Sequence, residues 1–360
     1  MKKRKNIMGK KIMAIGLVSI LATFFSPLCA KTIDVNSLND YVLGSDAGSQ
    51  AEANGKITLR HAMSLANPGD ILAIRPVKNI NTTNVKSMVI TLVASIECAP
   101  GVTIDGDPDA SGEKCIITAQ SPFVDRYSLF TARDQDDKQT LTIQNFIVIP
   151  VTGGSGTVLF ANRTGGNYVI SNCIFRIMGS SPQFDSSAIY IYNARHALID
   201  SNIFNFLYNM KVTSTNDIIL TDNVQKLVVT NNLFEVNIHK PTTQCCIHVH
   251  AFNGNVTNIE SNTFTGVVDY LYCGIKQDQP TFEIAHISGG RHTAGTDFVN
   301  NSLEGIYIES QRQESRMKCT SGIDIEQFAG ERPVSITSTH YSKMHAKWFS
   351  RNGDYGFYID

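Results

Sequence analysis

The sequence predicts an all-β fold, a solenoid in which the chain winds through stacked coils of just under thirty residues. Three observations predict it: a look-alike segment that recurs along the chain, a second apolar set with nearly the same period, and polar turns between them. A repeat of this length is typical of solenoids, because each unit can bury its apolar side only against its neighbours. A β-sandwich is the alternative, but it does not require a fixed period.

The recurring segment has a large apolar residue at its first and last positions, with Asn, Ser or Thr between them. Successive segments end 29, 29, 30, 30 and 39 residues apart. We therefore expect equivalent residues to stack, with aromatic rings in one interior column. The segments are 141–146, 170–175, 199–204, 229–234, 259–264 and 298–303, ending on Phe146, Phe175, Phe204, Phe234, Phe264 and Leu303.

A second apolar set predicts at least one more strand in each coil. Its members are Val158, Ile189, Ile218, Ile247, Ile275 and Ile306. Parallel strands of adjacent coils would lie about 4.8 Å apart. At the turns, one phase of the repeat is occupied by asparagine, whose inward amide can satisfy backbone groups of its own and the adjacent coil. We expect this ladder to contain Asn202, Asn232, Asn262 and Asn301.

The repeat resembles the right-handed parallel β-helix of the pectin-lyase-like superfamily, over residues 75–330. Residues 331–360, which include Trp348 and several other aromatic residues, are then expected to form a C-terminal cap. The resemblance implies that any activity lies on the outer face of one sheet, where side chains of successive coils form a groove.

Residues 1–30 have the pattern of a secretory signal peptide. A basic stretch is followed by an apolar run over 12–25, which is too short to span a bilayer. The alternatives are a lipoprotein signal acylated at Cys29, although Ser26-Pro27-Leu28 matches a lipobox badly, and a retained anchor. We expect export to the periplasm, the cell surface or the medium. No later stretch is apolar enough to be a transmembrane segment.

The charge balance argues against a nucleic-acid partner. Six of the 31 basic residues and none of the 32 acidic ones lie in residues 1–30, so 25 basic residues remain against 32 acidic, a net charge of −7. A mildly acidic chain is poorly suited to binding phosphates.

Residues 31–74 are expected to form an N-terminal cap of strand, loop and helix. Leu59, Ala62, Met63 and Ala66 share one helical face. Thr58 can cap the start, Asn67-Pro68-Gly69 ends the helix, and a strand follows over 70–74. Such a helix would cover the open end of a β-structure.

Residues 57–72 also resemble the "CSLREAI" segment that opens many bacterial parallel β-helix proteins, including passengers similar to polymorphic outer-membrane proteins. Leu59, Arg60 and Ala62 fit the pattern, as do Ala66-Asn67 and Gly69-Asp70. Ile57 and His61 depart from its Cys and Glu. The resemblance implies architecture and carries no chemistry.

The apolar phase also predicts an outer face. If Ile189, Ile247, Ile275 and Ile306 point inward, their neighbours point outward. Aromatic rings beside polar groups suit a sugar polymer, although strand propensity alone enriches tyrosine on a solvated face. The predicted ligand-binding residues are Tyr190, Tyr192, His248, His250, Tyr307 and Glu309, and the same face would contain Ile219, Thr221, Lys276 and Asp278.

The histidines of this face are the catalytic candidates. His248 or His250 could act as the base of a lyase or hydrolase if Lys276 or Glu309 lies nearby. Cys246, His248 and His250 alternate along one strand and could bind zinc, but no carboxylate is evident beside them, and surface histidines are common. We therefore predict no metal here.

Two further groups have structural alternatives. Cys245 and Cys273 lie 28 residues apart and could form a disulfide between coils, or could be small buried rungs. Cys98 with Cys115 is a weaker pair, and Cys173 takes an asparagine position of the ladder. Asp105, Asp107 and Asp109 could hold calcium, but their Asp-Gly and Pro-Asp pairs are typical of a turn.

The function prediction depends on this fold and on absent motifs. Polygalacturonase-type enzymes of this fold have Asn-Thr-Asp, an Asp pair, Gly-His-Gly and Arg-x-Lys, and none occurs here. A pectate-lyase-like cluster of Asp with Arg is also missing. We expect a non-catalytic surface or periplasmic protein that binds a glycan, or a host or envelope partner. The alternatives are a polysaccharide lyase or hydrolase acting on the Tyr190–His248–Glu309 face, and a structural passenger-like rod.

Overall fold

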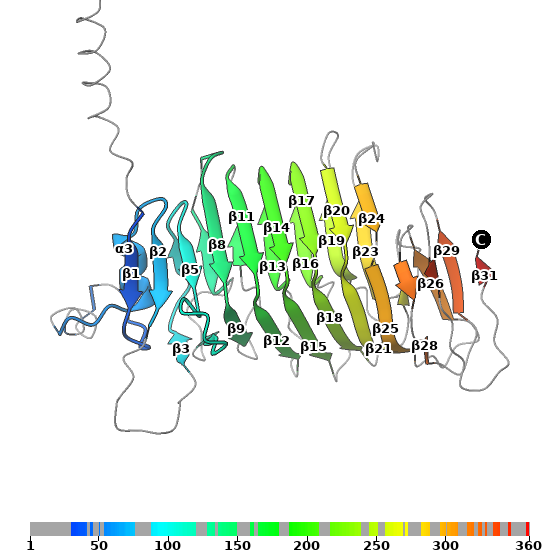
Figure 1. Ribbon diagram of the computed structural model, residues 1–360, viewed down its shortest axis with the longest axis horizontal. Helices are drawn as coiled ribbons and strands as arrows, with labels where there is room; N and C mark the ends of the chain where they lie inside the picture. The colour runs from blue at the N-terminus through cyan, green and yellow to red at the C-terminus, as the bar shows by residue number, and fades with distance from the viewer. Residues whose placement is uncertain are drawn as a thin grey trace, which may run out of the picture. The chain divides into compact units, whose positions relative to one another are not determined.

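The computed structural model confirms an all-β parallel solenoid (Figure 1). Contacts divide the chain into two units, 1–31 and 32–360, of which the second contains the solenoid. The described residues are 30–41, 44, 45, 50, 54–75, 88–119, 128–133, 136–149, 159–161, 165–179, 187–208, 217–238, 245–250, 256–268, 271, 272, 282–288, 296–299, 301–308, 315–319, 323–325, 328, 329, 334–338, 345, 346, 358 and 359. Beyond Thr265 only the backbone is described. Residues 1–29 of the predicted signal peptide and Trp348 lie outside the described residues.

Sheet A contains the second strand of each coil. On the strands whose side chains are described, the inward positions are apolar except for Thr257 on β20, and they alternate with more exposed ones, as expected for a strand with one buried face. The strands are all parallel, and from end to end they are β1 (Thr32–Val35), β2 (Ile71–Ile74), β5 (Thr103–Asp105), β8 (Thr140–Gln144), β11 (Asn167–Ser171), β14 (His196–Asp200), β17 (Lys226–Thr230), β20 (Val256–Glu260) and β24 (Thr296–Val299).

In the five coils from β8 to β20, sheet B follows sheet A after a turn of one or two residues. A residue with positive φ, Asn or Ser, makes this turn in five successive coils: Asn145, Asn172, Ser201, Asn231 and Ser261. The strands are β3 (Val89–Leu92), β6 (Cys115–Ala119), β9 (Phe146–Ile149), β12 (Ile174–Gly179), β15 (Ile203–Tyr208), β18 (Leu233–Ile238), β21 (Thr263–Val268), β25 (Asn301–Ile308), β27 (Ile323–Ile325) and β30 (His345–Ala346), with β28 (Phe328–Ala329) beside β25.

Sheet C begins each coil, so a described coil has three strands where the sequence predicted at least two. The strands are β4 (Ile96–Cys98), β7 (Phe130–Ala132), β10 (Leu159–Ala161), β13 (Ile189–Tyr192), β16 (Ile219–Asp222), β19 (Cys245–His250), β23 (Phe282–Ser288) and β22 (Leu271–Tyr272). A fourth sheet contains β26 (Ser315–Cys319), β29 (Val334–Ser338) and β31 (Tyr358–Ile359). Residues 331–360, predicted to form a C-terminal cap, therefore contribute parallel strands, β29 and β31 to this sheet and β30 to sheet B.

The interior contains the predicted aromatic column. Phe175, Phe204, Phe234 and Phe264 are fully buried, and their rings stack with centroids 4.8, 4.9 and 4.8 Å apart. The first segment was aligned wrongly: Val148, not Phe146, pairs with Phe175. Phe146 stands two residues earlier and is also buried. A shift of two keeps the same face, so the apolar pattern alone cannot detect it.

The asparagine ladder is confirmed for three coils. The Asn202 amide donates to Ile170 O and Asn232 Oδ1, and Asn232 donates to Ile199 O and Asn262 Oδ1, at 2.9–3.0 Å. Cys173 takes the preceding position, as predicted, and its backbone N–H donates to Asn202 Oδ1 at 2.9 Å. The side chain of Asn301 lies outside the described residues.

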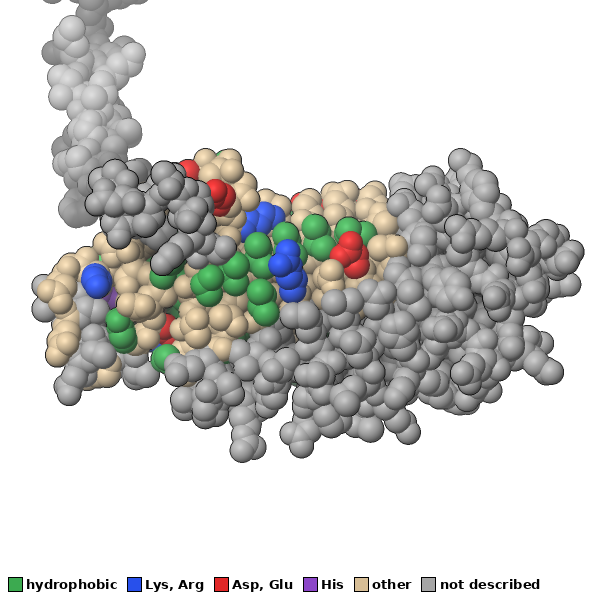
Figure 2. Space-filling view, turned by 90° about the horizontal axis from the view of Figure 1, so that it is seen from below, with side chains coloured by type: hydrophobic (Ala, Val, Ile, Leu, Met, Phe, Trp, Pro, Cys, Tyr) green, Lys and Arg blue, Asp and Glu red, His purple; other side chains and the backbone are tan. Residues whose placement is uncertain are grey.

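The outer side of sheet B has an apolar row that the repeat did not predict. On five adjacent strands, β6, β9, β12, β15 and β18, one half-buried apolar residue faces outward, and these residues are in register. Figure 2 shows hydrophobic side chains gathered along this face, beside basic and acidic ones. Strand register therefore aligns outward residues as well as inward ones. The row contains Ile116, Ile147, Ile174, Ile203 and Leu233.

Near the N-terminus, helix α3 (Leu59–Leu65) begins where the sequence predicted. Thr58 Oγ1 accepts the His61 N–H at 3.1 Å, and Leu59, Ala62 and Met63 are buried in the core. The helix ends one residue earlier than its apolar pattern, at Leu65.

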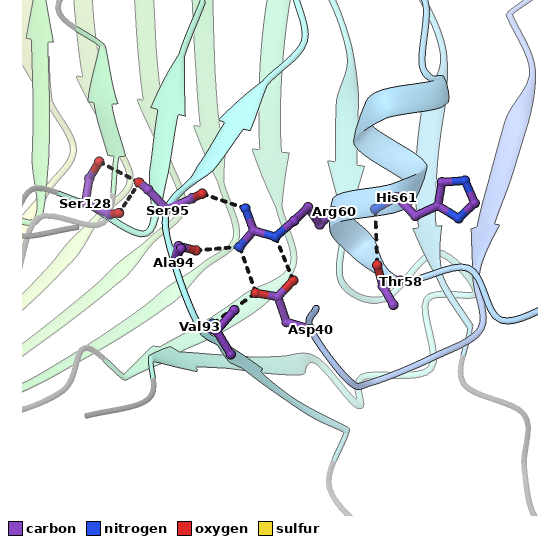
Figure 3. Close-up of polar contacts among 8 residues, drawn as sticks. All are labelled: Asp40, Thr58, Arg60, His61, Val93, Ala94, Ser95 and Ser128. Atoms are coloured by element: carbon purple, nitrogen blue, oxygen red, sulfur yellow. Dashed lines mark hydrogen bonds and ion pairs between the residues drawn. The ribbon is translucent and has the colours of Figure 1, made fainter. Parts of the chain in front are cut away.

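Arg60 fixes α3 to two other segments (Figure 3). Its guanidinium donates to both carboxylate oxygens of Asp40, at 2.9 and 2.7 Å, and to the carbonyls of Ala94 and Ser95, at 2.6 and 2.8 Å. Asp40 also accepts the Val93 N–H at 2.9 Å. Only 13% of the Arg60 side chain and 2% of the Asp40 side chain are exposed. The fork geometry of arginine satisfies all four acceptors at once.

We expect Arg60→Lys to loosen this junction. Lysine keeps the charge but has no planar fork, so at least one buried acceptor loses its donor, at a cost of about 1–2 kcal/mol. Hydrogen exchange should then quicken in residues 36–41 and 93–95 while sheet A of the later coils stays protected. Lys226→Arg on the exposed start of β17 is the control, and equal exchange in both variants would contradict a role for the fork.

Candidate functional site

The structure brings part of the predicted outer face together on sheet C. Tyr190 and Tyr192 alternate with the buried Ile189 and Ile191 on β13, so both rings face outward and are half-buried. On β16 the prediction was wrong by one residue: Ile219, not Ile218, pairs with Ile189. Ile219 and Thr221 are accordingly fully buried, and the outward residues beside the tyrosines are Leu220 and Asp222.

The C-terminal part of the predicted face lies elsewhere. Ile306 and Tyr307 belong to β25 in sheet B, where they pair with Gly266 and Val267, so Tyr307 is not on the sheet of Tyr190. The strand beside β19 is β23, and His286 is the register partner of His248. The regular period fails here because two strands, β22 and β23, lie between β21 and β24. Ile275, Lys276, Asp278 and Glu309 lie outside the described residues.

His248 has a partner that the sequence did not reveal. Its Nδ1 lies 2.5 Å from Asp217 Oδ2, and the exposed fractions of the two side chains are 21% and 9%. Asp217 stands two residues before Ile219, in the preceding coil, at the turn that leads into β16. Because a carboxylate only accepts, Nδ1 is the nitrogen that donates in this contact. The carboxylate therefore fixes both the tautomer and the orientation of His248.

Asp222 is a second acidic group on this face. It is the register partner of Tyr192 on one side and of His250 on the other. Its Oδ1 is buried and has no hydrogen-bond partner among the described residues. Burial, and then the charge of Asp222, raise the pKa of Tyr190, so this phenol stays protonated and can donate. A hydroxyl-rich ligand here would meet acceptors, a donor and two aromatic rings.

The described cysteines are buried structural residues. Cys98, Cys115, Cys173 and Cys246 are free thiols, so the Cys98–Cys115 disulfide was wrong. Cys98 and Cys115 take inward positions of β4 and β6, Cys173 lies at the turn between β11 and β12, and Cys246 is fully buried on β19. Cys246 is fully buried while His248 is partly exposed, so these two side chains do not share a solvent-exposed surface, and the side chain of His250 lies outside the described residues.

The second predicted disulfide joins Cys245 to Cys273. The side chain of Cys245 and the whole of Cys273 lie outside the described residues, and the register partner of Cys245 is Glu283.

These buried thiols should resist alkylation in the folded protein. Burial raises the pKa of Cys115 and of Cys173 to about 12, so the reactive thiolate is scarce at pH 8. Mass mapping after iodoacetamide treatment should find both unmodified in buffer and modified in guanidinium. Rapid labelling of Cys173 in buffer would contradict its place in the ladder.

The same pKa change makes stability depend on pH. The Cys173 thiol ionises near pH 9.0 in the unfolded chain, whereas burial raises its pKa in the folded protein to about 12. Between these two pH values ionisation favours the unfolded chain, so stability that is fully present below pH 9.0 is lost as the pH rises. We therefore expect the urea midpoint to fall above pH 9, and to fall less in Cys173→Ala. An equal fall in both proteins would contradict the assignment to Cys173.

The three acids of the suggested calcium loop have separate partners. Asp105 accepts from Gln144 and Asn145, each at 2.8 Å, while Asp107 accepts from Ser111 and the Gly112 N–H, at 2.7–2.9 Å. Burial opposes ionisation of Asp107, but its hydrogen bonds from Ser111 and Gly112 outweigh it and lower its pKa. Asp109 pairs with Arg75 at 3.2 Å. This arrangement is what the turn interpretation predicts.

Among the described side chains, no group of three or more His, Cys, Asp or Glu is placed to hold a metal ion. Within the same residues we find no helical segment with the length and hydrophobicity of a transmembrane helix. Comparison with known proteins gives no family: no protein-family model matches the sequence, and no curated protein matches it significantly.

Proposed function

We propose that this chain is an exported right-handed β-helix, closed at its N-terminal end by α3, whose outer sheet C face binds a glycan or a partner protein without catalysis. Parallel strands joined by crossovers within one sheet strongly favour the right hand. The basic and apolar pattern of 1–30 supports export to the periplasm, cell surface or medium.

The observation that carries the binding proposal is the arrangement around Asp222. Two outward tyrosines stand beside a buried carboxylate oxygen that has no hydrogen-bond partner within the described part of the chain. Tyrosine offers a large rigid surface at low entropic cost, and its ring can stack on the apolar face of a sugar. An unpaired buried acceptor costs free energy in the unliganded protein, and a ligand hydroxyl could satisfy it.

The test uses purified residues 31–360. A glycan array identifies a ligand, and calorimetry then measures its affinity as a single glycan. Tyr190→Ala should weaken a detected glycan about tenfold or more, the loss expected of a central aromatic contact. Tyr41→Ala, which lies outside β13 and the strands paired with it, is the matched control. Glycan binding that survives Tyr190→Ala and Tyr192→Ala would overturn the proposal for this face.

The His248–Asp217 pair favours a second candidate, a polysaccharide lyase or hydrolase, because a carboxylate-oriented imidazole is suited to general base chemistry. Pectin, alginate and chondroitin should be incubated with the protein, following absorbance of unsaturated products and release of reducing ends. Product that the wild type forms and the His248→Ala variant does not would show that the protein is an enzyme. Absence of both turnover and glycan binding would favour the structural rod.

A further inference from the structure

The apolar row on the outer side of sheet B is continuous over five strands (Figure 2). Ile174, Ile203 and Leu233 are half-buried register partners on β12, β15 and β18. With Ile116 and Ile147 they form the sheet B row, which extends for about 19 Å because adjacent strands lie about 4.8 Å apart. A continuous apolar row on one face of a sheet is typical of a surface that packs against another surface.

Two opposite charges lie beside this row, one on each side of β15. Two residues further along the same strands, the outward positions are Arg176 on β12, Asn205 on β15 and Glu235 on β18, all in register. Arg176 is exposed, whereas Glu235 is half-buried and accepts from the Asn205 amide at 2.9 Å. The backbones at Arg176 and Glu235 are each about 4.8 Å from β15. The two charges are therefore equal in distance from β15 and opposite in sign.

A two-fold axis that runs along β15, in the plane between two facing sheets, makes this surface complementary to itself. The rotation keeps the strand direction and exchanges β12 of one copy with β18 of the other. Arg176 of each copy then faces Glu235 of the other. In the row, Ile174 faces Leu233, and Ile203 faces its own equivalent. Facing sheets pack about 10 Å apart, a gap that an arginine and a glutamate side chain can bridge together.

We propose that the sheet B row is the interface of a symmetric homodimer, in which a second copy of this chain packs on β12, β15 and β18 with its solenoid axis reversed. Charge complementarity identifies the second copy as the occupant, because one rotation satisfies both charges of both copies while it covers the row. On the next strands, Ile147 of β9 faces Thr263 of β21, whose methyl group extends the apolar contact. The inference goes beyond the proposed function, which concerns sheet C.

The experiment is sedimentation equilibrium of tag-free residues 31–360 at micromolar to submillimolar concentrations. We expect a reversible equilibrium between monomer and dimer. Arg176→Glu and Glu235→Arg each place like charges opposite one another at both symmetric contacts, so each should raise the dimer dissociation constant at least about tenfold. The double variant restores opposite charges at both contacts, and its dissociation constant should lie within about threefold of the wild-type value.

Lys226→Glu is the matched control, since it reverses an exposed charge at the start of β17 in sheet A and should dimerise like the wild type. A monomer at every concentration would overturn the proposal, and would leave the row to a different partner. A double variant as weak as the single ones, or a control as weak as Arg176→Glu, would also overturn it. Circular dichroism of each variant should match the wild type, which separates a lost contact from a lost fold.

The dimer and the glycan proposal are tested separately. Sedimentation is measured without any glycan, so its failure would leave the sheet C proposal standing. Failure of every glycan to bind would likewise leave the dimer standing, because the two proposals use different sheets.

Discussion

Asn232→Ala should lower the free energy of unfolding by about 4 kcal/mol. The side chain is buried, and its Oδ1 accepts from the N–H and the amide of Asn202, at 2.9 and 3.0 Å. Its Nδ2 donates to Ile199 O and Asn262 Oδ1, each at 2.9 Å. Alanine leaves two donors of Asn202 and one carbonyl without partners in the interior, and each such group costs about 1–3 kcal/mol.

The measurement is urea unfolding of residues 31–360, followed by circular dichroism at 25 °C. Asn205→Ala is the matched control, since this asparagine is half-buried on the outer side of β15 and makes one side-chain bond, to Glu235. We expect it to cost less than about 1 kcal/mol. A loss in Asn232→Ala no larger than in the control would mean that the ladder contributes no stability.

This ladder and the aromatic column could be predicted because their signals are repeated. Each depends on one residue type that returns every 29 or 30 positions, and stacking of like on like requires only that the period be constant. Four of the phenylalanines and three of the asparagines accordingly lie where the sequence placed them.

The outer face was harder to predict, because it depends on register at single-residue resolution. Ile218 and Ile219 are both apolar and both buried, so the pattern does not say which one begins the alternation. Choosing Ile218 moved Thr221 to the outside and hid Asp222. The partner of His248 left no signal, since Asp217 reaches it from a turn of another coil, and turn geometry has no periodic signature.

The irregular coil after β21 is the second feature that the sequence pattern did not predict. A constant period predicts that Ile275 follows Ile247 on the same sheet, whereas the chain adds β22 and returns through β23, so that Ala285 takes that position. The inserted strand lengthens this coil, so a residue placed by the constant spacing of the second apolar set no longer falls on the same sheet. Tyr307 was therefore assigned to sheet C although it lies in sheet B.

Phe204→Ala should cost about 4 kcal/mol, because it removes a large side chain from the middle of the aromatic column. Phe204 is fully buried and stacks between Phe175 and Phe234, with centroids 4.8 and 4.9 Å away. Truncation of a buried phenylalanine costs about 3–5 kcal/mol through lost transfer energy and the cavity left behind.

The adjacent residue gives the control for this prediction. Ile203 precedes Phe204 on β15 and is half-exposed on the outer row of sheet B, so Ile203→Ala should cost only about 1 kcal/mol. Phe204→Leu keeps most of the volume and should fall between the two. The three urea midpoints together test which face of β15 is the interior. If Ile203→Ala proved as destabilising as Phe204→Ala, the stacked column would not be the core of the coil, and the outward placement of the sheet B row would be wrong with it.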